Sequence, residues 1–152
     1  MKVLSLMQPW ASLVVMGVKK IETRNWTTAY RGPLLIHASQ SKAGAELAAA
    51  GLFKKYISSF KDLPFGALIG QAILTDIVRT EALDLPDHLL NQLTLEEKAF
   101  GDYGFGRYGW LLEEAETFEA PIPAKGQLGI WEFEEEALRA LLQDASLSLR
   151  KE

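Results

Sequence analysis

Three ionisable side chains, Lys19, Glu22 and Arg24, lie close together near the N-terminus of this 152-residue chain. A carboxylate in such a group can take up a proton or accept a hydrogen bond from the exocyclic amine of cytosine. Arg and Lys can hold a phosphate or a carbonyl oxygen, and an aromatic face such as that of Trp26 can stack a base. These residue types predict a charged site that holds a nucleobase or a segment of RNA.

The segment 20–26 alternates and is rich in β-branched and aromatic residues, which predicts a strand. Because successive side chains of a strand point to opposite faces, Glu22 and Arg24 should share one face with Lys20 and Trp26. The alternative is a surface ion pair along an exposed strand. The spacing alone leaves both interpretations open.

A short helix is expected just before this strand. Trp10, Leu13 and Val14 fall on one helical face, and Gly17 is placed to end the helix. Lys19 then lies in the turn, from which its side chain can swing toward the charged face of the strand.

The other elements have irregular spacing. Strands are expected over 3–6, 34–38, 66–79, 108–118 and 128–133, the last two joined through Pro121 and Pro123. Helices are expected over 41–56, with Ser41 as N-cap, over 86–100, and over 134–149. Since strands do not alternate regularly with helices, the pattern favours an α+β fold over a doubly wound parallel sheet. The expected fold is a small mixed β-barrel with an early short helix, inserted helices and a C-terminal helix.

A Gly-rich aromatic run at 101–110 is the second candidate binding segment. Its residues 104–109 spell G-x-G-x-x-G, but they lead into a strand, whereas a dinucleotide fingerprint opens a helix. A loop of this composition can lay Tyr103, Phe105 or Arg107 over a base. The alternative is that its aromatic side chains pack into the core.

The residue types of this chain do not predict a metal site or a cofactor site. The chain has no cysteine, and its two histidines, His37 and His88, lie far apart in the sequence. A deaminase-type zinc site needs cysteine ligands, and no nucleophile elbow of the form G-x-S-x-G is present, although Ser39 and Ser41 follow His37. We expect no metal and no cofactor, and we interpret His37 as a hydrogen-bonded structural residue.

The formal net charge of -4 is unevenly distributed. Residues 1–61 carry nine basic and two acidic residues, whereas the remainder carries seven basic and eighteen acidic ones. Such asymmetry indicates a polyanion-facing surface, with Arg31 among its basic residues, unless the basic residues are merely scattered. No stretch approaches the roughly 18 apolar residues of a membrane span, so a single cytoplasmic domain over 1–152 without a membrane partner is expected.

Four segments in order resemble the ASCH family. Its G-x-K-x-x-E-x-R motif is met by Gly17, Lys19, Glu22 and Arg24, and the segments 8–11, 31–38 and 125–131 also look like ASCH segments. The likeness covers roughly residues 2–39, 66–78 and 108–133. The resemblance implies a PUA-like β-barrel with a cleft at its mouth, and a link to RNA or to modified nucleosides.

The resemblance also implies an enzymatic alternative. Some small bacterial ASCH proteins hydrolyse the acetyl amide of N4-acetylcytidine with the motif lysine, a threonine three residues later and a distant glutamate. Lys19 matches the lysine, but Glu22 stands at the threonine position, Thr23 should point to the opposite face, and the distant glutamate is not placed. Glu22 would then act as a general base on water.

Two hypotheses therefore stand. One is an RNA- or nucleobase-binding domain, and the other is a metal-independent hydrolase of a modified nucleoside or of RNA, with Lys19 and Glu22 catalytic. The expected binding residues are Lys19, Glu22, Arg24, Trp26, Arg31, Tyr103, Phe105 and Arg107.

Overall fold

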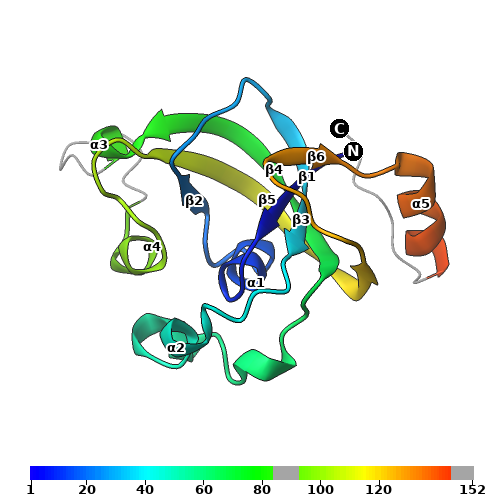
Figure 1. The fold of residues 1–152 in the computed structure, drawn as a ribbon. Coiled ribbons are helices and arrows are strands. Elements are labelled where there is room, and N and C mark those ends of the chain that lie inside the picture. The colour runs from blue at the N-terminus through cyan, green and yellow to red at the C-terminus, as the bar shows by residue number, and fades with distance from the viewer. Residues whose placement is uncertain (84–92, 145–152) are drawn as a thin grey trace.

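The computed structural model describes residues 1–83 and 93–144 (Figure 1). Its strands are β1 (Lys2–Leu6), β2 (Ile21–Arg24), β3 (Gly32–Ala38), β4 (Ala67–Arg79), β5 (Tyr108–Pro123) and β6 (Ile130–Glu132). Its helices are α1 (Trp10–Val15), α2 (Ala45–Ala48), α3 (Thr80–Leu83), α4 (Leu95–Phe100) and α5 (Glu135–Asp144), with 3-10 turns η1 (Gly51–Lys55) and η2 (Phe60–Asp62).

The strands form one six-stranded sheet in the order β2-β5-β4-β3-β1-β6. β1 and β3 are parallel, and the other neighbours are antiparallel. Register shifts interrupt the pairing of β4 with β5 at three points, and such bulges bend strands and increase their twist. The long strands therefore curl, so that the sheet wraps partly around α1 (Figure 1).

The α+β class is confirmed, whereas a closed barrel is not observed. Among the described residues, β2 and β6 lie at the two ends of the strand order and do not pair with each other. The gap between these two edges is where the candidate site lies.

Alternation along the strands supplies two cores. Leu4, Leu34 and Ile36 pack with Ala11 and Val14 of α1, whereas their neighbours in sequence face the other side of the sheet. That second core comprises Val3, Leu35, Leu68, Phe118, Ile122 and Trp131 together with Leu138 and Leu142 of α5. Each face of the sheet thus buries its own helix, and both helices match the predicted positions.

The predicted helix over 41–56 is wrong in extent. Only the one turn of α2 is α-helical, its N-cap is Gly44 rather than Ser41, and η1 follows it. Gly51, the first residue of η1, has a φ of +58°, a left-handed conformation that a regular α-helix over 41–56 could not contain. Gly44 packs so tightly on Gln8 that a Cβ would lie 2.1 Å from the Gln8 carbonyl oxygen, a long-range contact that local propensity does not reveal.

Two other boundaries differ from the predictions. β5 continues through Pro121 and Pro123, which were expected to lie in a connection. Proline donates no hydrogen bond to the ladder and is tolerated only where that donor is not needed. The strand β2 begins at Ile21, so Lys20 precedes it. Of the helix predicted over 86–100, residues 86–92, including His88, lie outside the described residues. Of the helix predicted over 134–149, residues 145–149 lie outside them.

Candidate functional site

The three motif side chains form one chain of ion pairs. The Lys19 ammonium lies 3.3 Å from Glu22 Oε1, and the Arg24 guanidinium donates to Glu22 Oε2 at 3.1 Å. Lys19 also donates to the backbone carbonyl of Ile21, and its side chain is only 1% exposed. The predicted contact of Glu22 with Arg24 on one face is therefore present, and Lys19 does reach that face from the turn.

Pairing of β2 with β5 holds this group in place. Glu22 lies opposite Trp110, a fully buried residue whose indole N–H donates to the backbone carbonyl of Trp26. The Trp26 ring packs edge-on against Trp110 at 4.8 Å and lies 5.5 Å from the Arg24 guanidinium carbon. Trp26 thus lies against Arg24, whose guanidinium also pairs with Glu22.

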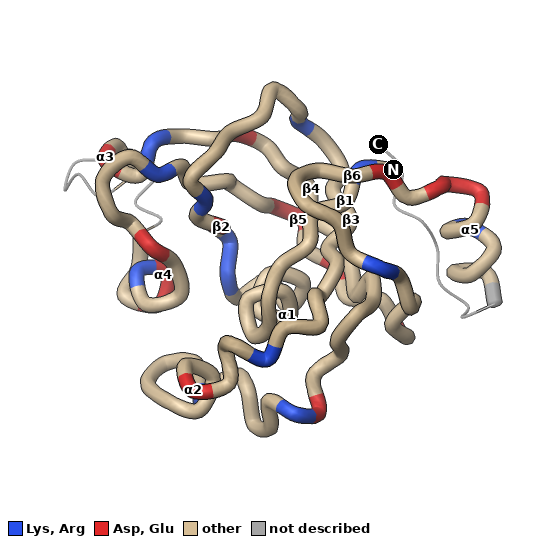
Figure 2. The backbone as a smooth tube through the Cα atoms, in the orientation of Figure 1, with Lys and Arg blue, Asp and Glu red and all other residues tan. Residues whose placement is uncertain are grey.

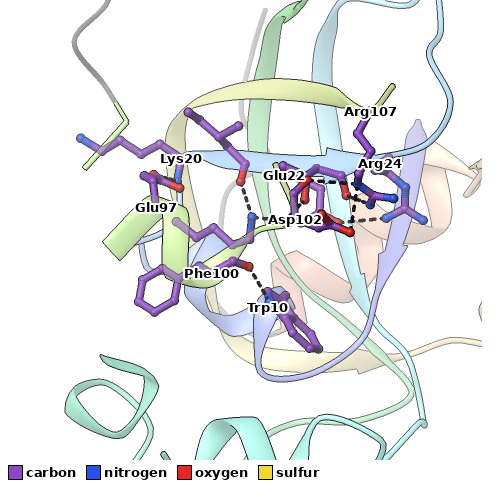
Figure 3. Close-up of polar contacts among 11 residues, drawn as sticks. Trp10, Lys20, Glu22, Arg24, Glu97, Phe100, Asp102 and Arg107 are labelled. Atoms are coloured by element: carbon purple, nitrogen blue, oxygen red, sulfur yellow. Dashed lines mark hydrogen bonds and ion pairs between the residues drawn. The ribbon is translucent and has the colours of Figure 1, made fainter. Parts of the chain in front are cut away.

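Glu97 of α4 is a second carboxylate beside Lys19, and the sequence analysis did not single it out. Its side chain is buried and accepts a hydrogen bond from the backbone N–H of Lys20 at 2.6 Å. Burial raises the pKa of Glu97, and the Lys20 hydrogen bond and the Lys19 charge only partly oppose this rise. Figure 3 shows Glu97 and Lys20 together on the α4 side of β2, with the Lys20 side chain extending away from Glu22, so Lys20 does not join the charged face as predicted.

A cavity of about 780 Å³ lies between the two edges of the sheet. Arg24 reaches it from β2, while its other walls come from the ends of β1 and β3 and from the loop 123–129 before β6. Arg24 and Lys125 are the charged residues among its described lining, which contains no carboxylate. The remaining lining residues are Ser5, Leu6, Met7, His37, Ser39, Gln40, Gly66, Pro123, Ala124, Gly126, Gln127, Leu128 and Gly129.

The other expected binding residues do not line this cavity. Lys19, Glu22 and Trp26 are absent from its lining, although Glu22 and Trp26 contact Arg24. Arg31 lies 3.6 Å from Asp76 and donates hydrogen bonds to the backbone carbonyls of Thr28 and Tyr30. The structure therefore brings Arg31 to an ion pair with β4 rather than to the cavity.

The loop 101–107 lies against the outer side of β2. Arg107 donates to the carbonyl of Thr23 at 3.2 Å, and Thr23 Oγ1 in turn accepts from the backbone N–H of Asp102 at 2.8 Å (Figure 3). Tyr103 is half-buried, whereas Phe105 is 89% exposed. Arg107 thus anchors the loop, and Phe105 is the aromatic side chain of this run that remains available to stack.

Ser5 and His37, at the floor of the cavity, are also residues that the sequence analysis did not join. Ser5 Oγ lies 3.0 Å from His37 Nδ1, and His37 Nε2 lies 2.7 Å from the carbonyl oxygen of Ala124. Burial lowers the pKa of His37, and the hydrogen bond to Ala124 opposes this only partly. The parallel pairing of Ser5 with His37 creates the contact, and no local signal could have shown it.

No group of three or more potential metal ligands occurs among the described residues. None of the described helices has the length and apolar character needed to span a membrane.

Comparison of this chain with models of known protein families finds a match. The ASCH domain model matches residues 4–122. The chain belongs to the ASCH domain family. This family is associated with RNA binding.

Relatives of this ASCH domain include two mammalian proteins named activating signal cointegrator 1. The human protein is 42% identical over 79 residues, which are 48% of this chain and 14% of that protein. The mouse protein is 29% identical over 139 residues, which are 86% of this chain and 22% of that protein. The chain therefore spans less than a quarter of the length of either relative.

Solved structures of an ASCH protein from Zymomonas mobilis share the fold. One superimposes with a TM-score of 0.56 at 18% identity and covers 93% of each chain. A serine-to-alanine mutant of the same protein gives a TM-score of 0.57, also at 18% identity, and the match covers 93% of this chain and 94% of that one. At this identity the likeness supports the PUA-like architecture alone.

Proposed function

We propose that this ASCH domain binds a nucleobase or modified nucleoside, free or as an unpaired residue of RNA, in the cavity between β2 and the loop 123–129. The observation that carries the proposal is the placement of Arg24. Its guanidinium pairs with Glu22, which Lys19 also binds, and reaches a cavity of about 780 Å³, a size typical of small-molecule sites.

The charge of the site supports the proposal. In a chain of net charge -4, the described cavity lining carries two cations and no carboxylate. Arg24 Nε is buried and has no hydrogen-bond partner in the protein, and an unpaired buried donor is costly unless a ligand acceptor meets it. A base carbonyl or a phosphate oxygen would satisfy this donor.

Hydrolysis of a modified nucleoside is the second candidate, and Glu97 favours it. In this scheme Glu22 is the general base, Lys19 stabilises the developing charge, and Glu97 is our candidate for the distant glutamate of N4-acetylcytidine hydrolases. Its raised pKa favours the protonated carboxyl that a proton donor needs. The Lys19 side chain is only 1% exposed and does not line this cavity, which favours binding over catalysis.

The variant Glu22→Gln separates the two functions. If Glu22 is a general base, the rate of N4-acetylcytidine hydrolysis should fall about 10²–10⁴-fold with nearly unchanged affinity, because the amide cannot take up a proton. If Glu22 only orients Arg24, affinity for cytidine should weaken by roughly 1–3 kcal/mol, with no turnover in either protein. Calorimetric titration with cytidine and chromatography of the products measure both.

Glu46→Gln is the matched control, since Glu46 is an exposed carboxylate of α2 that does not line the cavity. It should leave affinity and turnover unchanged. Unaltered affinity and turnover in Glu22→Gln as well would reduce the Lys19–Glu22–Arg24 group to a structural ion-pair chain.

A further inference from the structure

The hydrogen bonds around His37 determine the proton positions on its ring. A backbone carbonyl can only accept, so His37 Nε2 must donate its proton to Ala124, at 2.7 Å. In the neutral imidazole Nδ1 is then an acceptor, and the hydroxyl of Ser5, 3.0 Å away, is the group that donates to it. Trp131 Nε1 donates to the same hydroxyl oxygen at 3.1 Å.

This arrangement has the parts of an activated nucleophile. A hydroxyl lies within hydrogen-bond reach of a base, and a third group orients that base. The imidazole is 1% exposed and its pKa is lowered, so it is neutral and able to accept a proton at neutral pH. Ser5, in contrast, is only half-buried and lines the cavity.

We infer that Ser5 and His37 form a nucleophile–base pair for acyl transfer from an ester or amide bound in the cavity. As Ser5 Oγ attacks the carbonyl carbon, its proton passes to His37 Nδ1. The bond to the leaving group then breaks, the leaving group takes that proton, and an acyl-serine remains. Water attacks the acyl-serine, returns a proton to Ser5 through Nδ1, and releases the acid.

The lining of the cavity suits an acyl group. Leu6, Met7 and Leu128 provide apolar surface, and Met7 and Leu128 are 39% and 97% exposed, at its rim. Arg24 and Lys125 are the charged groups lining the cavity, and they are available to oppose the charge of the tetrahedral oxyanion.

Ser5 would supply the hydroxyl nucleophile that the hydrolase alternative lacks at Glu22. Acylation of Ser5 would take place in the cavity of the proposed function but would not involve the Lys19–Glu22 pair, so it does not depend on that alternative. Cytidine binding and acylation are therefore separate measurements, and either can fail alone.

The test is incubation of the full chain with p-nitrophenyl acetate, followed by release of p-nitrophenolate and by mass mapping of the acetyl group. We expect acetylation at Ser5, its loss in Ser5→Ala, and about a 10²–10⁴-fold slower reaction in His37→Gln. Ser58→Ala is the matched control, because Ser58 is an exposed serine outside the cavity and Ser5 is the serine bonded to His37. It should react like the original protein.

Three results would overturn the inference: acetyl groups mapped to Lys125 and other lysines instead of Ser5, an unchanged rate in Ser5→Ala, or no acetylation of the folded original protein. The mapping on the original chain decides the question even if Ser5→Ala does not fold. Cytidine titration of the same sample shows whether the binding site is intact.

Discussion

At the scale of single residues, the two cations of the motif serve different purposes. Lys19 is enclosed by Glu22, Glu97 and the carbonyl of Ile21, and Arg24 is the cation that meets the cavity. Removing one partner of a buried ion pair costs about 3–5 kcal/mol, since it leaves an uncompensated buried charge. Loss of activity in a Lys19 variant therefore would not by itself assign Lys19 a catalytic role.

His37 should make the stability of the domain depend on pH. Its pKa is lowered from 6.5 in the folded state, so below pH 6.5 the unfolded chain takes up a proton that the folded chain does not. The free energy of unfolding should therefore fall as pH drops from 6.5 toward the lowered pKa, by at most about 1.4 kcal/mol per pH unit.

Urea titrations of the original protein and of His37→Gln at several pH values measure this effect. Arg24 and Lys125 are the charged groups that line the same cavity, and both are present in the two proteins compared. The raised pKa of Glu97 acts with the opposite sign, so the difference between the two proteins isolates His37. If the free energy of unfolding depended on pH in the same way in both proteins, His37 would not be a neutral, buried histidine.

At the scale of elements, the loop 123–129 is held against the sheet by a close approach at Gly126. A Cβ on Gly126 would lie 2.7 Å from His37 Cε1 and 3.1 Å from Ser5 Oγ. Ala124 accepts the His37 hydrogen bond two residues earlier. The loop therefore packs this closely against Ser5 and His37 because position 126 has no side chain.

Gly126→Ala should destabilise the domain by about 1–3 kcal/mol, because the loop or the imidazole must shift to make room. Urea unfolding should show a lower midpoint with an unchanged slope. Gln127→Ala, at an exposed position of the same loop, should stay within about 0.5 kcal/mol of the original protein. Equal stability of both variants would mean that the loop does not lie on His37 in solution.

At the scale of the whole molecule, the basic and acidic residues do not separate into two faces. The excess of basic residues in 1–61 and of acidic residues in the remainder had suggested such a separation. Figure 2 shows Lys and Arg interspersed with Asp and Glu along most of the chain, with acidic residues gathered at the start of α5. The cavity is a local exception. This distribution favours a ligand held at one point over a long RNA laid across a basic surface.

The salt dependence of binding to a short single-stranded RNA should accordingly be shallow. Two phosphate contacts, from Arg24 and Lys125, give a slope of about -1.4 in log affinity against log salt concentration. Lys125→Gln should reduce the magnitude of this slope by about 0.7. Lys61→Gln, at a position that does not line the cavity, should leave the slope unchanged. A slope steeper than about -2.8 would indicate an extended basic groove instead.

The sequence alone determined the parts of the domain that depend on local periodicity. Alternation placed Glu22 and Arg24 on one face, and helical spacing with Gly17 placed α1, because neighbouring side chains along a strand or helix have fixed directions. The motif also indicated the family, which the match over residues 4–122 confirms. A single domain over the full 152 residues stays a prediction.

Only the tertiary structure decided which of these residues meet a cavity and which partners they find there. Glu97 reaches Lys20 across 77 positions, and Ser5 meets His37 because β1 and β3 pair in parallel with one register. Trp26 proved to lie against Arg24, and Arg31 to pair with Asp76. Such contacts depend on strand register and on bulges that curl the sheet, and these are set by the packing of distant segments rather than by the order of nearby residues.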